Sequence, residues 1–183
     1  VIQGKVSGDV SGGGPGSSFN CSLFGGLTKM RTCDLSGLDT SNSTSLQGMF
    51  WQCTSLEDVD LTSLNTSRVT NMNGMFTGCK NLRSVNMTGI DTSHVTDFSY
   101  LFRDCSSLSN IDTAYLNTSN ALDMTHMFAN TGISTIDLSS LDTSNAKSMG
   151  GMFSACKHLK EIDISSFDMS KLGEKPDSFF YNC

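Results

Sequence analysis

Apolar and polar side chains alternate in a short triplet that returns along the chain. In Val59-Asp60-Leu61 and Ile136-Asp137-Leu138, an aspartate stands between two apolar residues. Alternation with a period of two is typical of a strand with one buried face, so the aspartate is expected to point outward. We predict a short strand at each occurrence of this triplet, which occupies residues 33–35, 59–61, 85–87, 111–113, 136–138 and 162–164.

A second apolar pattern follows the triplets and has a helical period. Met72, Met75, Phe76 and Cys79 stand at positions i, i+3, i+4 and i+7, which lie on one face of a helix. Glycine weakens a helix, and Gly74 lies inside this segment. The pattern therefore predicts one or two short helical turns in each repeat, of the α or the 3₁₀ kind.

The two patterns return together with a nearly constant period. Phenylalanines stand at equal intervals at positions 24, 50, 76, 102 and 128, and Phe153 and Phe180 follow at intervals one place shorter and one place longer. Such a period is typical of a solenoid, in which stacked coils of strand, turn, short helix and turn bury a continuous core. We predict a single solenoid of about six coils over residues 19–183, and a separate Gly/Ser-rich segment over residues 1–18.

The residues from Leu56 to Cys79 carry a resemblance to a known family. Their pattern is Leu-x-x-Val-Asp-Leu-x-x-Leu-Asn-Thr-Ser-x-Val-Thr-x-Met-x-x-Met-Phe-x-x-Cys. It resembles the 26-residue repeat of bacterial surface proteins, a branch of the BspA-like leucine-rich repeats, and the likeness covers about residues 24–183. The resemblance implies an α/β repeat fold: a leucine-rich-repeat-like right-handed solenoid with one parallel β-sheet face and short helices or 3₁₀ turns on the other. It also implies a secreted or cell-surface protein, such as an adhesin.

Charge and composition narrow the classes of partner. The chain has 183 residues and a formal net charge of −6, with no long run of either sign. Nucleic acid is excluded as a partner because its binding needs a basic footprint. No apolar stretch approaches the roughly 20 residues that a membrane span needs. The start at Val1 and the richness in Ser, Thr, Asn and Gly favour an extracellular or cell-surface location.

The central positions of the triplets form a column of acidic residues. Neighbouring strands lie about 4.8 Å apart, so carboxylates in such a column repel one another unless they are solvated, paired or bound to cations. The column is either an acidic stripe for a basic partner or Ca²⁺, or a solvated sheet face whose aspartates are hydrogen-bonded locally. No calcium-binding repeat and no His/Cys/Asp cluster with metal spacing is present, so we expect no metal and no cofactor. The members are Asp34, Asp60, Asp112, Asp137 and Asp163, with Asn86 in the third repeat.

Two further features concern the outer surface. Trp51 follows the core residue Phe50 in a variable column and is expected to be exposed, either as a binding anchor or packed at the chain end. The phrase Asp/Asn-Thr-Ser follows the first five triplets, with Asp168-Met169-Ser170 after the sixth, and its Asp or Asn side chain is predicted to lock a turn. Its threonines form either an outward ladder like that of ice-binding solenoids or hydroxyls bonded within the turn; they are Thr40, Thr66, Thr92, Thr118 and Thr143.

The cysteines and the Asn-x-Ser/Thr sites each have two interpretations. An odd number of cysteines leaves at least one free or bonded between chains; the seven are Cys21, Cys33, Cys53, Cys79, Cys105, Cys156 and Cys183. Stacking could bring cysteines of adjacent coils within disulfide range, and the alternative is buried thiols that act as small apolar residues. The Asn-x-Ser/Thr sites could carry N-glycans, although the repeat itself generates several of them; they are Asn20, Asn42, Asn65, Asn86 and Asn117.

No catalytic set can be placed in this chain. A nucleophile, a base and an orienting residue do not come together in the repeat, so we predict a protein that is not an enzyme. The leading hypothesis is a binding or adhesion module whose partner is a host or neighbouring surface protein or glycan. The alternative is a structural protomer, a homopolymer that forms an extracellular filament or surface layer through the N-terminal segment and uncapped solenoid ends.

Overall fold

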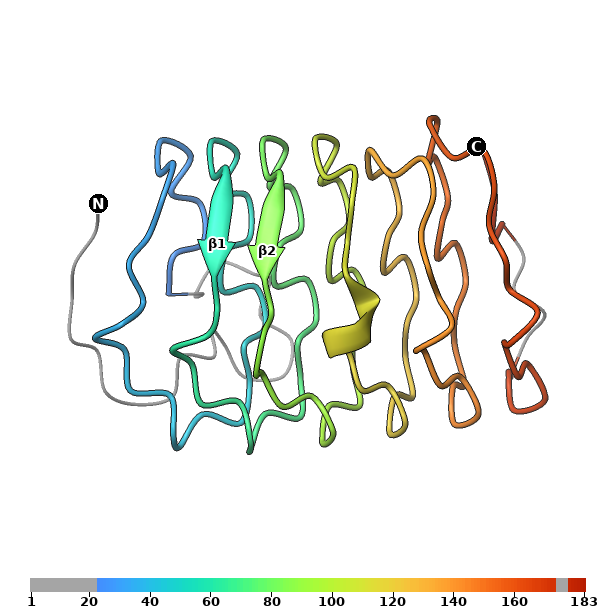
Figure 1. Cartoon of the computed structure of the whole chain (residues 1–183), viewed down its shortest axis with the longest axis horizontal. Helices are drawn as coiled ribbons and strands as arrows, with labels where there is room; N and C mark the ends of the chain where they lie inside the picture. The colour runs from blue at the N-terminus through green and yellow to red at the C-terminus, as the bar shows by residue number, and fades with distance from the viewer. Residues whose placement is uncertain (1–22, 174–177) are drawn as a thin grey trace.

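The repeats are arranged one after another along the molecule. The computed structural model describes residues 23–173 and 178–183, and the chain advances along its longest axis from the first repeat to the last (Figure 1). We call each repeat, from the start of one triplet to the start of the next, a coil. The predicted segment 1–18 lies outside the described residues.

One short parallel sheet joins two neighbouring coils. Strand β1 (Asp58–Asp60) pairs in parallel with β2 (Ser84–Asn86), and Val59 lies opposite Val85 (Figure 1). The strand prediction is confirmed at these two triplets and is wrong at the other four, which lie within the described residues and have no strand. Single hydrogen bonds join the coils nearby, such as Ser107 N to Lys80 O at 3.1 Å. In the fourth triplet the chain enters the 3₁₀ helix η1 (Thr113–Tyr115), whose first turn is capped by the Asp112 carboxylate.

The segment with the helical period is not a helix. Residues 72–79 form successive turns, in which Met75 N donates to Met72 O at 3.2 Å and Cys79 N donates to Phe76 O at 3.0 Å. Gly74 and Gly78 have φ of 59° and 78°. These left-handed residues interrupt the right-handed backbone that a helix requires.

The N–H groups of these turns alternate between two kinds of acceptor. Met75 N donates within its own coil, whereas Met72 N and Phe76 N donate to the next coil, to Asp97 O at 2.9 Å and Leu101 O at 3.0 Å. The same ladder continues through parallel bridges at Ser45, Asn71, Asp97, Asp123 and Ser148. Both kinds of bond satisfy buried backbone groups, so the stack needs no helices on this side.

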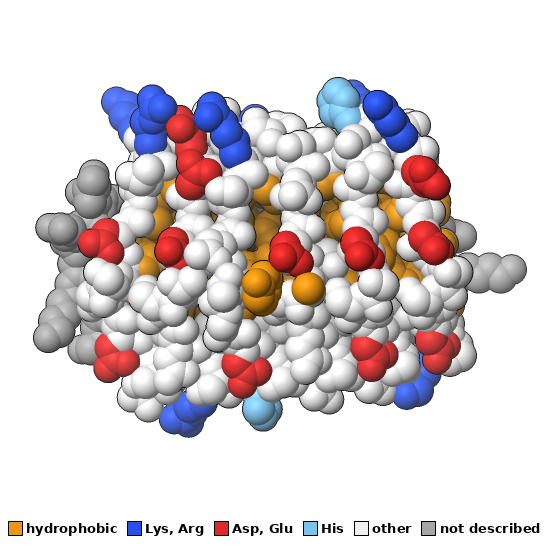
Figure 2. Space-filling view, in the orientation of Figure 1, with side chains coloured by type: hydrophobic (Ala, Val, Ile, Leu, Met, Phe, Trp, Pro, Cys, Tyr) orange, Lys and Arg blue, Asp and Glu red, His pale blue; other side chains and the backbone are white. Residues whose placement is uncertain are grey.

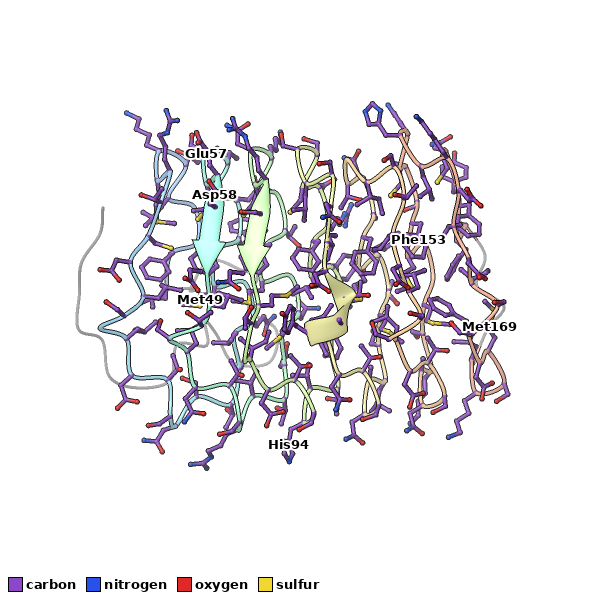
Figure 3. The ribbon with its side chains drawn as sticks, in the orientation of Figure 1. Met49, Glu57, Asp58, His94, Phe153 and Met169 are labelled. Atoms are coloured by element: carbon purple, nitrogen blue, oxygen red, sulfur yellow. The ribbon has the colours of Figure 1, made fainter. Side chains whose placement is uncertain are left out.

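The core is a set of residue columns that pass through all coils. The Phe50 and Phe76 rings stack with centroids 5.3 Å apart, and the same arrangement runs from Phe24 to Phe153. Met49 and Phe153 lie inside the stack (Figure 3), and both are fully buried. The predicted inward positions of Leu, Met, Phe and Cys are confirmed in these columns, because each coil covers the apolar face of the next.

The cysteine column supports the phenylalanine column. Cys79 Sγ donates to Phe50 O of the preceding coil at 3.0 Å, and the same bond recurs at Cys53, Cys105, Cys156 and Cys183. In the shortened coil Thr131 occupies this column, where its hydroxyl donates to Phe128 O at 2.8 Å and lies 3.4 Å from Cys156 Sγ. The threonine hydroxyl therefore donates within its own coil, and Phe128 O accepts from both Thr131 and Cys156.

Candidate functional site

The predicted acidic column is an exposed row on one face. Figure 2 shows carboxylates spaced along the middle of this face, and the structure places Asp34, Asp60, Asp112, Asp137 and Asp163 on the surface. Each accepts a hydrogen bond from the backbone N–H two residues later, as Asp60 does from Thr62 N at 2.9 Å. These bonds lower the pKa of Asp60, Asp137 and Asp163, because they stabilise the charged form. The row is therefore both exposed and locally hydrogen-bonded. No group of three or more His, Cys, Asp or Glu residues in the described part of the chain could hold a metal ion.

A second row of Asp and Asn residues locks the turns, as predicted. The N–H of each following serine donates to the Asp or Asn side chain, for example Ser144 to Asp142 at 2.9 Å and Ser67 to Asn65 at 3.2 Å. Hydrogen bonds from the side chain and backbone of Ser144 lower the pKa of Asp142. In the same way, hydrogen bonds from the serine two residues later lower the pKa of Asp39, Asp91 and Asp168.

The threonines of these turns point inward and join neighbouring coils. Thr92 is 1% exposed; its Oγ1 accepts from Asn117 N at 2.7 Å and donates to Asn117 O at 3.1 Å. Thr40 makes the same pair of bonds to Asn65. The interpretation of these threonines as an outward ladder is wrong, because all five are buried. Their hydroxyls take the place of backbone hydrogen bonds between coils.

The face in Figure 2 is striped along the direction of the stack. Lys and Arg side chains gather along its upper edge, apolar side chains show in a band below them, and two rows of carboxylates follow. Arg31 and Glu57 form an ion pair of 2.5 Å between neighbouring coils. Glu57 and Asp58 lie near the upper edge and His94 lies at the lower rim (Figure 3). Stacking has thus turned residues from successive coils into continuous surfaces.

Trp51 does not lie fully on the surface. Its side chain is half-buried, and its carbonyl accepts from Gly26 N at 2.7 Å. Thr77 and Ala129 at the same place in later coils are buried, and Arg103 is exposed. The expectation that this column is exposed is therefore wrong at Thr77 and Ala129 and is confirmed at Arg103. Thr77 lies against the next coil, where its hydroxyl donates to Tyr100 O at 2.7 Å.

The described cysteines are free thiols. Cys53, Cys79, Cys105 and Cys156 are buried, Cys33 is half-buried and Cys183 is exposed. Burial raises the pKa of Cys53 to about 11 and raises the pKa of Cys79, Cys105 and Cys156. Of the glycan candidates, Asn42, Asn65, Asn86 and Asn117 are exposed. Cys21 and Asn20 lie outside the described residues.

Two hollows on the stack bring residues of several coils together. The first, which we call the triplet cavity, has a volume of about 500 Å³ and lies between η1 and the next coil. Asp112 and Asp137 of the acidic row both line it, together with hydroxyls such as Ser139. The second, which we call the turn cavity, has a volume of about 830 Å³, and its lining includes Arg103, Asp104, His126, Asn130, Ser154 and Lys157. None of these six residues was predicted as a site residue.

The turn cavity lies beside an unusual pair of residues. Tyr100 and His126 have φ of 60° and 54°, and Gly48, Gly74 and Gly151 occupy the same place in other coils with φ near 60°. A column of glycines indicates a left-handed backbone at this position. Two bulky residues in that column are therefore the sequence signal that could have pointed to the turn cavity.

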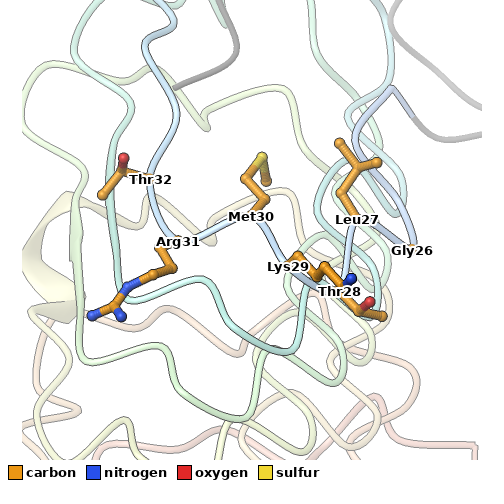
Figure 4. Close-up of a pocket in the computed structure, with 7 residues that line it drawn as sticks. All are labelled: Gly26, Leu27, Thr28, Lys29, Met30, Arg31 and Thr32. Atoms are coloured by element: carbon orange, nitrogen blue, oxygen red, sulfur yellow. The ribbon is translucent and has the colours of Figure 1, made fainter.

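A third hollow lies at the N-terminal end of the described chain (Figure 4). It has a volume of about 780 Å³ and is lined by the consecutive residues 26–32. Among the described residues one continuous segment lines it, so within that part of the chain it does not bring together polar groups from different coils, as the triplet and turn cavities do.

Comparison with known proteins places the repeats in a family. A family model described as "Mycoplasma protein of unknown function, DUF285" matches residues 20–133 and 114–183. The chain matches no curated protein and no solved structure. No helix in the described part of the chain has both the length and the apolar character needed to cross a membrane.

Proposed function

We propose that this chain, which belongs to the repeat family described as Mycoplasma protein of unknown function, DUF285, is a non-enzymatic binding or adhesion module of a cell surface. The family description names no function, so the proposal rests on the surface of the molecule. We further propose a right-handed solenoid of the BspA-like leucine-rich-repeat type. The stacked phenylalanines, the ladders between coils and the parallel pairing of β1 with β2 support this fold.

The observation that carries the proposal is the exposed acidic row. Leu, Met, Phe and Cys of the repeat are committed to the core, and its Thr and Ser are committed to turns. The carboxylates of the row stay exposed, at intervals set by the coils. A regular row of anions on a chain of net charge −6 favours an extended basic segment of a surface protein.

The triplet cavity is the best place for a basic side chain of that partner. Asp112 and Asp137 line it from adjacent coils, so a guanidinium or ammonium group there could donate charge-assisted hydrogen bonds to both. Tyr115 ends η1, directly after the lining residue Ala114, and is 40% exposed. Aromatic rings attract cations through their faces, so this residue would add to the same preference.

The test is binding of the purified protein to a panel of immobilised extracellular host proteins and glycans, followed by surface plasmon resonance. We expect saturable binding to a basic surface protein that weakens as the salt concentration rises. The double variant Asp112→Asn, Asp137→Asn should weaken this binding by about tenfold or more, since each charge-assisted hydrogen bond contributes about 1.5–3 kcal/mol. Asn86 shows that the row accepts an amide without loss of the turn.

The matched control is Asp142→Asn, Asp168→Asn, which removes the same charge from the second row. It should change the affinity much less. Equal effects of the two double variants, or binding that does not depend on salt, would contradict the proposed site. Failure to bind any member of the panel would count against a binding module as such. The filament alternative stays a prediction.

A further inference from the structure

The turn cavity is chemically different from the acidic row. It shares no lining residue with the triplet cavity, and it is formed by residues of successive coils on another part of the stack. Its volume of about 830 Å³ lies within the range of small-molecule sites, which is roughly 300–1,000 Å³. The turn cavity is therefore a separate candidate site from the acidic row.

The aromatic residues beside the cavity are held in a strained backbone. Tyr100 and His126 adopt the left-handed conformation that glycine adopts in three other coils. Their rings face each other with centroids 5.4 Å apart, and the Arg103 guanidinium lies 5.4 Å from the Tyr100 ring centre. The fold does not need these side chains here, because Gly48, Gly74 and Gly151 serve the same turn. Strain of this kind is typical of functional sites.

Hydrogen bonds fix which atoms are left for a ligand. His126 Nδ1 lies 3.2 Å from Gly151 O and 3.3 Å from Ser154 Oγ, and in the tautomer with the proton on Nδ1 it donates to the carbonyl. In the neutral ring Nε2 is then an acceptor. Asp104 is occupied, since it pairs with Arg103 Nε at 3.4 Å and accepts from Asn130 Nδ2 at 2.8 Å.

The local charge of the cavity is opposite to that of the whole chain. Arg103 and Asp104 balance each other, whereas no ion pair to Lys157 occurs among the described residues. The charged side chains among the described lining residues, Arg103, Asp104 and Lys157, therefore sum to one positive charge on a protein of net charge −6. A cationic hollow on an acidic protein favours an anion that also matches the remaining amide and hydroxyl groups.

We propose that the turn cavity binds an acidic sugar, a ring with several hydroxyls and one carboxylate, as found at the end of an anionic glycan. The carboxylate would meet Lys157 and Arg103, and the hydroxyls would meet the Asn130 amide, the Ser154 hydroxyl and His126 Nε2. The His126 ring, which lines the cavity and packs against Tyr100, would be the apolar side that the C–H face of a sugar ring contacts. A bare inorganic anion would use only the cations and would leave the other groups to water.

The test uses glucuronate as the probe, measured by isothermal titration calorimetry and by saturation-transfer NMR. We expect saturable binding, with glucose at least about tenfold weaker, since one charge-assisted hydrogen bond contributes about a factor of ten or more. Inorganic phosphate should also bind more weakly than glucuronate, because it leaves the amide, the hydroxyl and the His126 ring without a partner. Lys157→Gln should weaken glucuronate binding by about tenfold for the same reason. Lys160→Gln is the matched control, because it removes the same charge from the same coil outside the cavity lining and should leave binding unchanged.

A second variant separates binding from folding. Tyr100→Gly restores the residue type of the other coils, so the protein should remain folded by circular dichroism while glucuronate binding weakens. Absence of glucuronate binding by the folded protein, equal binding of glucose or phosphate, or equal effects of Lys157→Gln and Lys160→Gln would overturn the inference. None of these results depends on Asp112 or Asp137, so the inference and the acidic-row proposal fail separately.

Discussion

The contact between His126 and Gly151 allows a sharp test of the coil packing. Gly151 has φ of +60°, and the His126 ring of the preceding coil lies directly over it. A Cβ added at position 151 would overlap the ring, with Nδ1 only 2.5 Å away. Gly151→Ala therefore combines an unfavourable backbone conformation with a displacement of the imidazole.

The cost can be worked out from the separate contributions. A left-handed alanine costs about 1–2 kcal/mol, of which about 0.4–1 kcal/mol is offset because alanine restricts the unfolded chain. Moving the ring loses the hydrogen bond to Gly151 O, about 1 kcal/mol, and the Tyr100 contact, about 0.5–1.5 kcal/mol. We expect the free energy of unfolding to fall by about 2–4 kcal/mol and Tm to fall by roughly 5–15 °C.

The assay is urea and thermal unfolding, followed by circular dichroism and by Trp51 fluorescence. Gly150→Ala is the matched control, since a Cβ there has open space and this glycine lacks a positive φ. The free energy of unfolding of this control should lie within about 0.5 kcal/mol of that of the parent protein. In a His126→Gly background, Gly151→Ala should cost only about 1 kcal/mol, the backbone contribution. Equal stabilities of the two alanine variants, or a full penalty without the imidazole, would refute the reasoning.

Two further predictions concern the turns. Thr92→Val should lower the free energy of unfolding by about 1–3 kcal/mol, because the partly buried N–H and C=O of Asn117 lose their partner. Thr88→Val on the exposed surface is the control, and equal stability of the two variants would contradict the role of the inward hydroxyl. The lowered pKa values of Asp39, Asp91, Asp142 and Asp168 predict acid sensitivity. Their stabilising contribution is present above the unfolded pKa of about 3.9 and is lost as pH falls through the lower folded pKa. Urea midpoints should therefore drop on acidification below about pH 4. Replacing all four by Asn should reduce that drop and leave the part that Asp60, Asp137 and Asp163 contribute. A midpoint that stays constant to about pH 2 would contradict this prediction.

The error about the helical segment has a physical cause. Met72, Met75, Phe76 and Cys79 do point inward, as the period predicted. The spacing i, i+3, i+4, i+7 marks one face of a helix, but a chain of turns with hydrogen bonds from i+3 to i brings the same residues to one side. The choice between them depends on where Met72 N and Phe76 N donate, and they donate to the next coil. Acceptors that belong to another coil are outside the reach of a local pattern.

The candidate sites show the same limit. The exposure of Asp112 and Asp137 followed from alternation, but their meeting in one cavity required η1 to turn the chain at Thr113. Whether Thr92 points outward or inward was left open by the sequence, and the burial of its hydroxyl between two coils decided it. The turn cavity was not predicted at all, since Arg103, His126 and Lys157 share no motif.

The sequence by itself determined the period, the inward columns and the Asp/Asn-Ser turns, because these depend on contacts that every coil repeats. The tertiary structure decided the conformation of the backbone between the columns and which residues line each cavity. Both depend on how one coil lies against the next: a hydrogen-bond acceptor, a clash at Gly151 or a charge at Lys157 acts on a neighbour that belongs to a different coil. Local spacing predicts which side a residue faces, and only the register of the stack determines what it meets there.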